Sequence, residues 1–256
     1  WIMDLVAGDH QEVVLPAIPY DVDLSPSGDF AVAVMPTLQQ VAIIPLPYSD
    51  VFPFMAFPVE GMYVGQAHVS DDGSKVALFS NQSDEELIGI YDVDAHAYAV
   101  HRLYKKVKTV AFTPDNEILV VIHEKEPGHA ADPTDYEDVA DHSYGYSLVR
   151  VRDGYVKQQL TDAHPEPFLV HPDGSRIYLL QRRDDLDVRE VQITYTDTFV
   201  VNTVQLGSPP VSLGFVPDSD KVFVNQEHNS GRITFIDQWE NKQTITGFEL
   251  NDWIVE

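Results

Sequence analysis

Short apolar stretches alternate with polar turns along almost the whole chain, and no long stretch shows the 3.6-residue period of an amphipathic helix. Typical examples are Phe30 to Met35, Val41 to Leu46, Val76 to Phe79 and Ile118 to Ile122, which are rich in β-branched or aromatic residues. Apolar stretches of this length, bounded by Pro, Asp and Gly, are typical of β-strands. The pattern therefore predicts an all-β protein.

Five similar turns punctuate the pattern, and each lies between two apolar stretches. They are Ser25–Gly28, Ser70–Gly73, Thr113–Asn116, His171–Gly174 and Val216–Ser219. Pro presets φ at the start of such a turn, and Gly or Asn tolerates the positive φ at its end, so each turn predicts a hairpin. Two further apolar stretches follow each hairpin, and the turns end 45, 43, 58 and 45 residues apart. Four strands in about 44 residues are typical of one β-propeller blade.

We therefore expect one domain over residues 1–256, a β-propeller of four-stranded antiparallel blades. The five complete blades are expected at residues 16–61, 62–106, 107–165, 166–208 and 209–250. Residues Trp1 to Leu15 are expected to form the outer two strands of a further blade, and Asp252 to Glu256 one innermost strand. The length leaves two alternatives: a six-bladed propeller with one incomplete blade, or a seven-bladed ring without its N-terminal portion, which the missing first strands favour.

Two segments resemble a known repeat family. His171–Tyr178 (HPDGSRIY) and Gly231–Asp237 (GRITFID) are similar to bacterial β-propeller repeats of the YVTN type, which are distantly similar to WD40 repeats. The resemblance covers about Pro16 to Leu250, although the Gly-His and Trp-Asp signatures of WD40 blades are absent. It implies the propeller fold. For function it implies a family of surface, periplasmic and scaffold proteins that also includes lactonase-like enzymes.

Charge and composition narrow the classes of partner. Lys and Arg number 16 against 41 Asp and Glu, which gives a formal net charge of −25 and disfavours nucleic acid as a partner. The chain has no cysteine, which excludes disulfides and thiolate zinc sites. It has no apolar run near the roughly 18 residues that a membrane span needs, so we expect no transmembrane segment in this chain. The composition fits an extracytoplasmic protein, whether periplasmic, at the cell surface or secreted.

The 58-residue spacing marks an insertion at residues 124–145, between the second and third strands of the third complete blade. Residues 124–142 hold seven carboxylates, two imidazoles and one Lys. In propellers this connection emerges on the same face as the loops between blades. Three interpretations remain open: a solvated acidic loop, a loop that docks a partner, and a divalent-cation site. Calcium is the candidate ion, with Asp135, Glu137, Asp138 and Asp141 as ligands. We expect this loop to be either mobile or ordered by a cation or partner.

Further charged and imidazole side chains are predicted on the same face. The candidate ligand or partner face comprises His129, His142, His164, Asp184, Asp185 and His228. Catalytic motifs are mostly absent: His123-Glu124 begins the metalloprotease pattern H-E-x-x-H, but Pro127 replaces its second His. The sequence therefore favours a non-catalytic binding or structural module that engages a protein or saccharide. The alternative is a metal-dependent hydrolase similar to lactonase-type propellers, with scattered Asp, Glu and His ligands that activate water.

Overall fold

The computed structural model describes residues 2–3, 8, 10–49, 51, 53–128, 131–165 and 167–247. These residues form five four-stranded antiparallel sheets and one two-stranded sheet. Within every sheet, each strand pairs with its neighbours in the sequence, and the first strand lies at one edge. The predicted fold class, an all-β propeller with five complete blades and a partial one, is confirmed. The six sheets are also the number that the six-bladed alternative requires.

The strand bounds are as follows. Blade one contains β3 (Asp21–Leu24), β4 (Phe30–Met35), β5 (Gln40–Pro45) and β6 (Met55–Pro58), and blade two contains β7 (Gln66–Val69), β8 (Lys75–Phe79), β9 (Leu87–Asp92) and β10 (Ala97–Arg102). Blade three contains β11 (Val107–Phe112), β12 (Ile118–His123), β13 (Tyr144–Arg150) and β14 (Val156–Thr161). Blade four contains β15 (Phe168–Val170), β16 (Arg176–Arg183), β17 (Val188–Tyr195) and β18 (Val201–Gln205). Blade five contains β19 (Pro210–Phe215), β20 (Val222–Gln226), β21 (Arg232–Ile236) and β22 (Lys242–Thr246).

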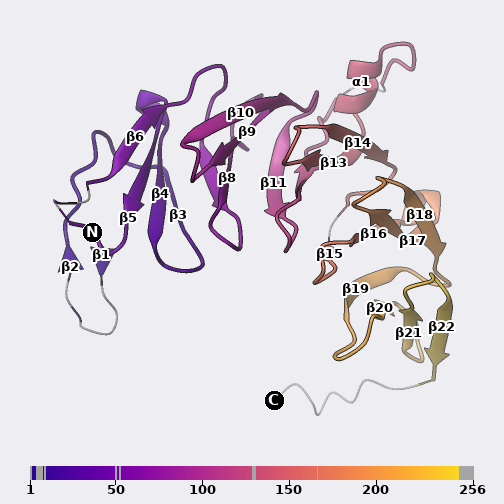
Figure 1. Cartoon of the computed structure of the whole chain (residues 1–256). Coiled ribbons are helices and arrows are strands. Elements are labelled where there is room, and N and C mark those ends of the chain that lie inside the picture. The colour runs from indigo at the N-terminus through magenta and orange to yellow at the C-terminus, as the bar shows by residue number, and fades with distance from the viewer. Residues whose placement is uncertain are drawn as a thin grey trace.

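The blades follow one another along an open arc, with the first strands β3, β11, β15 and β19 on its inner side (Figure 1). Within the described residues, three short helices lie between strands: η1 (Pro36–Leu38), α1 (Tyr136–Asp141) and η2 (Asp184–Leu186). The described ranges contain no helix of the length and apolar character that a bilayer crossing requires.

The N-terminal residues differ in detail from the expectation. The two-stranded sheet consists of β1 (Ile2–Met3) and β2 (His10–Gln11), whereas Glu12 to Leu15 form no strand. Val13 and Leu15 pack instead on the apolar face of blade one. The innermost strand expected at Asp252 to Glu256 lies outside the described residues.

In three of the five turns, a hydroxyl side chain at the first position helps to explain why the hairpin forms. The hydroxyl oxygens of Ser25, Ser70 and Thr113 accept hydrogen bonds from the backbone N–H five residues later, at 3.1, 3.0 and 3.0 Å. Such side-chain bonds satisfy a backbone donor that the tight turn would otherwise leave unpaired. The turn then needs a left-handed residue, which is Gly28 in the first turn, at φ +77°. In the fifth turn this residue is Asp218, one position before the last turn residue Ser219.

The hydrophobic core is a series of layers between blades. Four clusters of buried side chains each join one blade to the next: blades one and two share the first, and blades four and five the last. On the inner side of the arc, the carboxylates of Asp21 and Asp23 accept hydrogen bonds from the N–H groups of Ala67 and Val69, both at 2.8 Å. Blades one and two are thus joined by apolar packing and by carboxylates that satisfy the exposed edge of β7.

A buried position recurs at or near the end of the second strand of every blade. It lies seven residues after the last residue of each turn and is occupied by Met35, Ser80, His123, Gln181 and Gln226. In blade three, His123 Nδ1 lies 3.0 Å from the carbonyl oxygen of Lys106, and Nε2 lies 2.7 Å from Ser147 Oγ. Burial lowers the pKa of His123 to about 3, so the ring is neutral at pH 7. Nδ1 therefore carries the proton, and Nε2 accepts from the serine hydroxyl. His123 is thus a structural residue of blade three.

Candidate functional site

The topology places the insertion at one end of the blades. Residues 124–143 connect β12 to β13 at the end opposite the β11–β12 turn. The connections between blades, such as residues 103–106, emerge at that same end, which we call the top face. Figure 1 shows α1 projecting there beyond the strands of blade three. The insertion therefore lies where its sequence predicts.

The last turn of α1 is held by a buried lysine from the connection between blades two and three. Lys105 is 1% exposed, and its Nζ donates to the carbonyl oxygens of Ala140 at 2.6 Å and Asp141 at 3.2 Å. These carbonyls lie at the C-terminal end of the helix, where they also accept the N–H groups of Ser143 and Glu126, and a cation is favourable at such an end. Burial lowers the pKa of Lys105 to about 8, although Asp141 and Glu126 act against this shift. The ammonium thus anchors α1 to the propeller.

Two further cations hold the insertion on the top face. Lys106 Nζ lies 2.7 Å from Asp84 and 2.6 Å from Glu126, contacts that raise its pKa. Arg102 lies 3.6 Å from Glu137 on α1. The expectation that the loop is either mobile or ordered by a cation or partner stays a prediction. In its described part the insertion is held by lysine and arginine side chains of the protein itself.

Three of the four predicted cation ligands, Asp135, Glu137 and Asp138, have partners within the protein. Asp135 caps α1 by accepting from the N–H of Glu137 at 3.0 Å, and Glu137 itself faces Arg102. Asp138 lies 3.2 Å from the His142 ring, and burial together with Glu126 raises the pKa of Asp141. Across the described ranges, no three His, Asp or Glu side chains come together in a group that could hold a metal ion. The calcium hypothesis therefore gains no geometric support.

The predicted ligand-face residues are spread over several blades. His142 folds back on α1, with Nδ1 2.9 Å from the carbonyl oxygen of Asp138. His164 Nε2 lies 2.8 Å from Lys108 Nζ, and the ring packs edge-on against Tyr144. His228 is exposed and accepts from the N–H of Ser230.

The two aspartates of this set are paired within blade four. Asp184 receives two hydrogen bonds from Arg182, and Asp185 receives two from Arg183. Bidentate pairing of this kind fixes a carboxylate and occupies its acceptor sites. His129 lies outside the described residues. The structure therefore does not gather the five described residues of this set into one pocket.

A groove of about 310 Å³ on the top face, between blades one and two, was not predicted. Its lining includes Ile18, Pro19, Tyr20, Pro36, Tyr63 and Gln82. The Tyr20 hydroxyl donates to Gln82 Oε1 at 2.7 Å, which fixes one wall. The feature of the sequence that could have indicated this groove is the group of Tyr and Pro residues in the segments between strands, where apolar side chains do not pack into the core of a sheet. Aromatic and proline side chains of this kind are common at recognition surfaces.

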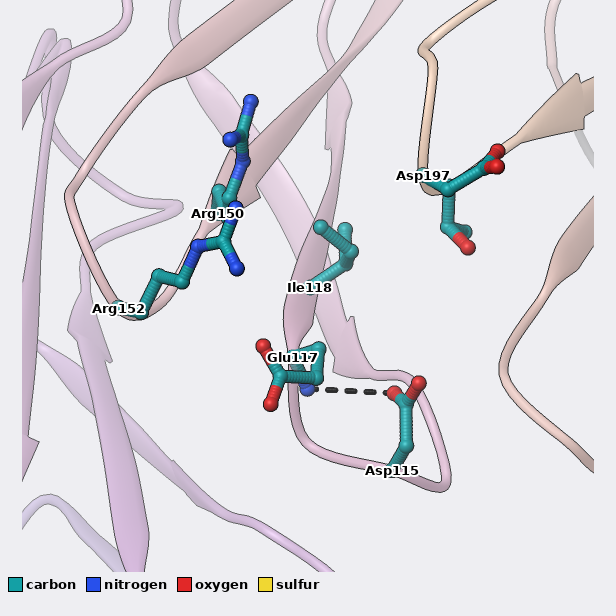
Figure 2. Close-up of a pocket in the computed structure, with 7 residues that line it drawn as sticks. Asp115, Glu117, Ile118, Arg150, Arg152 and Asp197 are labelled. Atoms are coloured by element: carbon teal, nitrogen blue, oxygen red, sulfur yellow. Dashed lines mark hydrogen bonds between the residues drawn. The ribbon is translucent and has the colours of Figure 1, made fainter.

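A second pocket, of about 260 Å³, lies at the opposite end of the blades, between blades three and four. Figure 2 shows Arg150 and Arg152 on one side, Asp197 on the other and Ile118 between them. The Arg150 guanidinium lies 5.1 Å from the ring centres of both Tyr155 and Phe199. Its lining suits a small ligand with separated opposite charges. Sequence patterns do not reveal this pocket, because its residues come from three turns of two blades.

Comparisons with known proteins support the fold but assign no family or function. The chain matches no protein-family model and no curated protein sequence. It is similar to a hydrazine synthase chain from Kuenenia stuttgartiensis, at 14% identity and a TM-score of 0.47, over 95% of this chain and 70% of that one. It is also similar to the β-propeller domain of Cps50 (Swd1) from Myceliophteria thermophila, at 10% identity and a TM-score of 0.50, over 89% of this chain and 67% of that one. This second similarity identifies the β-propeller fold alone.

Proposed function

We propose that this protein is a non-catalytic binding module that engages a partner protein through its top face. The observation that carries the proposal is the anchored insertion. A long acidic segment is held in one place by buried Lys105 and by two surface cations, so its outer side chains are presented in fixed positions. Tyr136 is 60% exposed on α1, and the Glu137 side chain is 66% exposed. A pre-positioned surface loses little conformational entropy on binding.

Charge suggests the chemistry of the partner. The formal net charge of −25 attracts a basic surface, and long-range attraction of this kind raises association rates. A tyrosine beside carboxylates can contact both apolar and basic groups of such a surface. The resemblance of His171–Tyr178 to bacterial YVTN repeats and an extracytoplasmic location belong to the same proposal. A saccharide partner is the other ligand class, and the groove that contains Tyr20 and Tyr63 would suit sugar stacking.

The test is binding of the purified protein to an array of lysine- and arginine-rich peptides, with a glycan array in parallel. We expect salt-sensitive binding to basic peptides that Glu137→Lys weakens at least fivefold. The matched control is Glu117→Lys, which makes the same charge change in the pocket at the opposite end of the blades. It should leave binding within twofold of the wild type.

Three results would contradict the proposal. Equal weakening by both substitutions would indicate non-specific attraction to a polyanion. Turnover in a lactone and ester hydrolysis screen, abolished by a chelator, would favour the metal-dependent hydrolase instead. Binding to glycans alone would replace the protein partner by a saccharide.

A further inference from the structure

A pair of charges that is closed within blade two is rearranged in blade three. In blade two, Lys75 begins the second strand and faces Asp92 on the third strand, with its Nζ 2.6 Å from the carboxylate. The equivalent residue of blade three, two positions after the last turn residue, is Ile118, and it faces Arg150. The cation of blade three therefore lies on the third strand, opposite an apolar side chain instead of a carboxylate.

Two arginines form one wall of the pocket between blades three and four, and their guanidinium groups have few partners. Arg150 lies 5.1 Å from the ring centres of both Tyr155 and Phe199, which fix its orientation. Within the described residues, the only carboxylate that contacts either arginine is that of Asp153, 3.4 Å from Arg150 Nη1 and 3.8 Å from Arg152 Nε. A guanidinium group can hold a carboxylate through two parallel hydrogen bonds. This wall can therefore bind a further carboxylate.

Two aspartates that line the same pocket are each held by their own turn through one oxygen. Asp115 Oδ1 accepts from the N–H of Glu117 at 3.2 Å, and Asp197 Oδ1 accepts from the N–H of Thr198 at 2.7 Å. Across the described ranges, Oδ2 of neither aspartate has a hydrogen-bond donor. A Cβ at Gly174 would overlap the Asp115 carboxylate, so this glycine lets the carboxylate lie against blade four. Each Oδ2 atom can therefore accept from an ammonium group of a ligand.

We propose that this pocket binds a small ω-amino acid, a linear molecule with a carboxylate at one end and an ammonium group at the other. Figure 2 shows Ile118 between the two arginines and Asp197, so the charged groups of the ligand must be joined by an apolar linker. The volume of about 260 Å³ is below the roughly 300–1,000 Å³ of pockets for drug-sized molecules, so this linker is short. The arginines hold the carboxylate, and Asp115 or Asp197 accepts from the ammonium group. The pocket lies at the opposite end of the blades from the top face, so this inference does not depend on the function proposed above.

The probe is 5-aminopentanoate, titrated into the full chain at low salt and followed by isothermal titration calorimetry. We expect saturable binding. Pentanoate and pentylamine, which each lack one of the two charges, should bind at least tenfold more weakly. The protein variants Arg152→Gln and Asp197→Asn should each weaken binding of 5-aminopentanoate at least fivefold. Both substituted residues are exposed, so both variants should keep the circular dichroism spectrum and Tm of the wild type.

The matched controls make the same two changes outside the pocket. Arg189→Gln removes an arginine of blade four that lies 2.6 Å from Asp187, and Asp94→Asn changes an exposed aspartate at the turn position of blade two that is equivalent to Asp197. Both should leave the dissociation constant within twofold of the wild type. Absence of saturable binding, or equal losses in the variants and the controls, would overturn the proposal. Equal affinity for pentanoate or for pentylamine would also overturn it, because one charge alone would then explain the binding.

Discussion

The His123 imidazole occupies a buried position that a glutamine, Gln181 or Gln226, occupies in the next two blades. Its folded pKa of about 3 lies far below the ordinary 6.5. As the pH falls through 6.5 the unfolded chain binds a proton that the folded chain does not, so stability is lost between about pH 6.5 and 3. Ser147 gives a protonated His123 ring no counter-charge, because its neutral hydroxyl serves as the donor to Nε2.

His123→Gln should remove this acid sensitivity. In blade five, Gln226 Nε2 donates to Thr234 Oγ1 at 2.6 Å, so a glutamine can bond to the hydroxyl on the neighbouring strand. We expect the free energy of unfolding, measured with urea at pH 7.5, to change by less than about 1 kcal/mol, because one hydrogen bond replaces another. The loss of stability between pH 6.5 and 4.5 should be clearly smaller in the variant. Parallel pH curves for the two proteins would refute this assignment.

Lys105 gives a pH dependence of the same sign as His123, but in a higher pH range. Its folded pKa of about 8 is below the ordinary 10.5, so the unfolded chain binds more protons between these values and stability rises with pH there. Relative to Lys105→Met, the wild type should gain up to about 3 kcal/mol of unfolding free energy from pH 8 to 10.5. At pH 7 the variant should also be cut faster by protease within residues 124–143. An unchanged difference across this pH range would show that the ammonium is not desolvated.

At the scale of strands, the two carboxylates of β3 hold blades one and two together. Asp21→Ala and Asp23→Ala should each lower the unfolding free energy by about 1–2 kcal/mol, because a backbone N–H of β7 loses its acceptor. Asp21→Asn keeps an acceptor oxygen and should cost less than half as much. The measurement is urea unfolding, with amide exchange at Ala67 and Val69 as the local readout.

Asp29→Ala is the control for this pair, because Asp29 is an exposed carboxylate in the same blade. It should change the unfolding free energy by less than about 0.5 kcal/mol. If it costs as much as Asp21→Ala, general charge effects rather than the two hydrogen bonds explain the result.

The strands could be predicted because their determinants are local. Ser25, Pro26 and Gly28 act within one turn, so the sequence places β3 and β4 correctly. The hydrogen bond from Lys105 that anchors α1 was not predictable in this way. Lys105 and Ala140 are 35 positions apart, and only the folded chain brings them together. Asp184 and Asp185 were predicted as ligand-face residues, but Arg182 and Arg183, only two positions away, bind them; this pairing is local and was overlooked rather than hidden. The arginine pocket of Figure 2 depends on which turns become neighbours, which no local pattern contains.

At the scale of the whole molecule, each blade of the arc packs on its neighbours in the sequence, and blade five is packed on one face by blade four. All five residues of its outermost strand β22 are exposed, whereas the outer strand of blade three, β14, is mostly half-buried. We expect hydrogen exchange followed by mass spectrometry to show faster exchange in β22 than in β14, by at least tenfold, because fewer apolar contacts oppose local opening. Equal rates would mean that the propeller opens only as one cooperative unit.

The anchored insertion has a consequence for how such a chain can change over time. The pairing of β12 with β13 runs without a break from Ile118 to His123. The two strands that flank the insertion are therefore fully paired up to its base. Lengthening a loop costs only a logarithmic loss of chain entropy, and one buried lysine here fixes the added segment. Natural variation or deliberate grafting can therefore place new sequences at this point while the strands of blade three stay paired. In blade three, the strand residues that maintain the fold are thus separate from the inserted residues, which can change to give a new binding specificity.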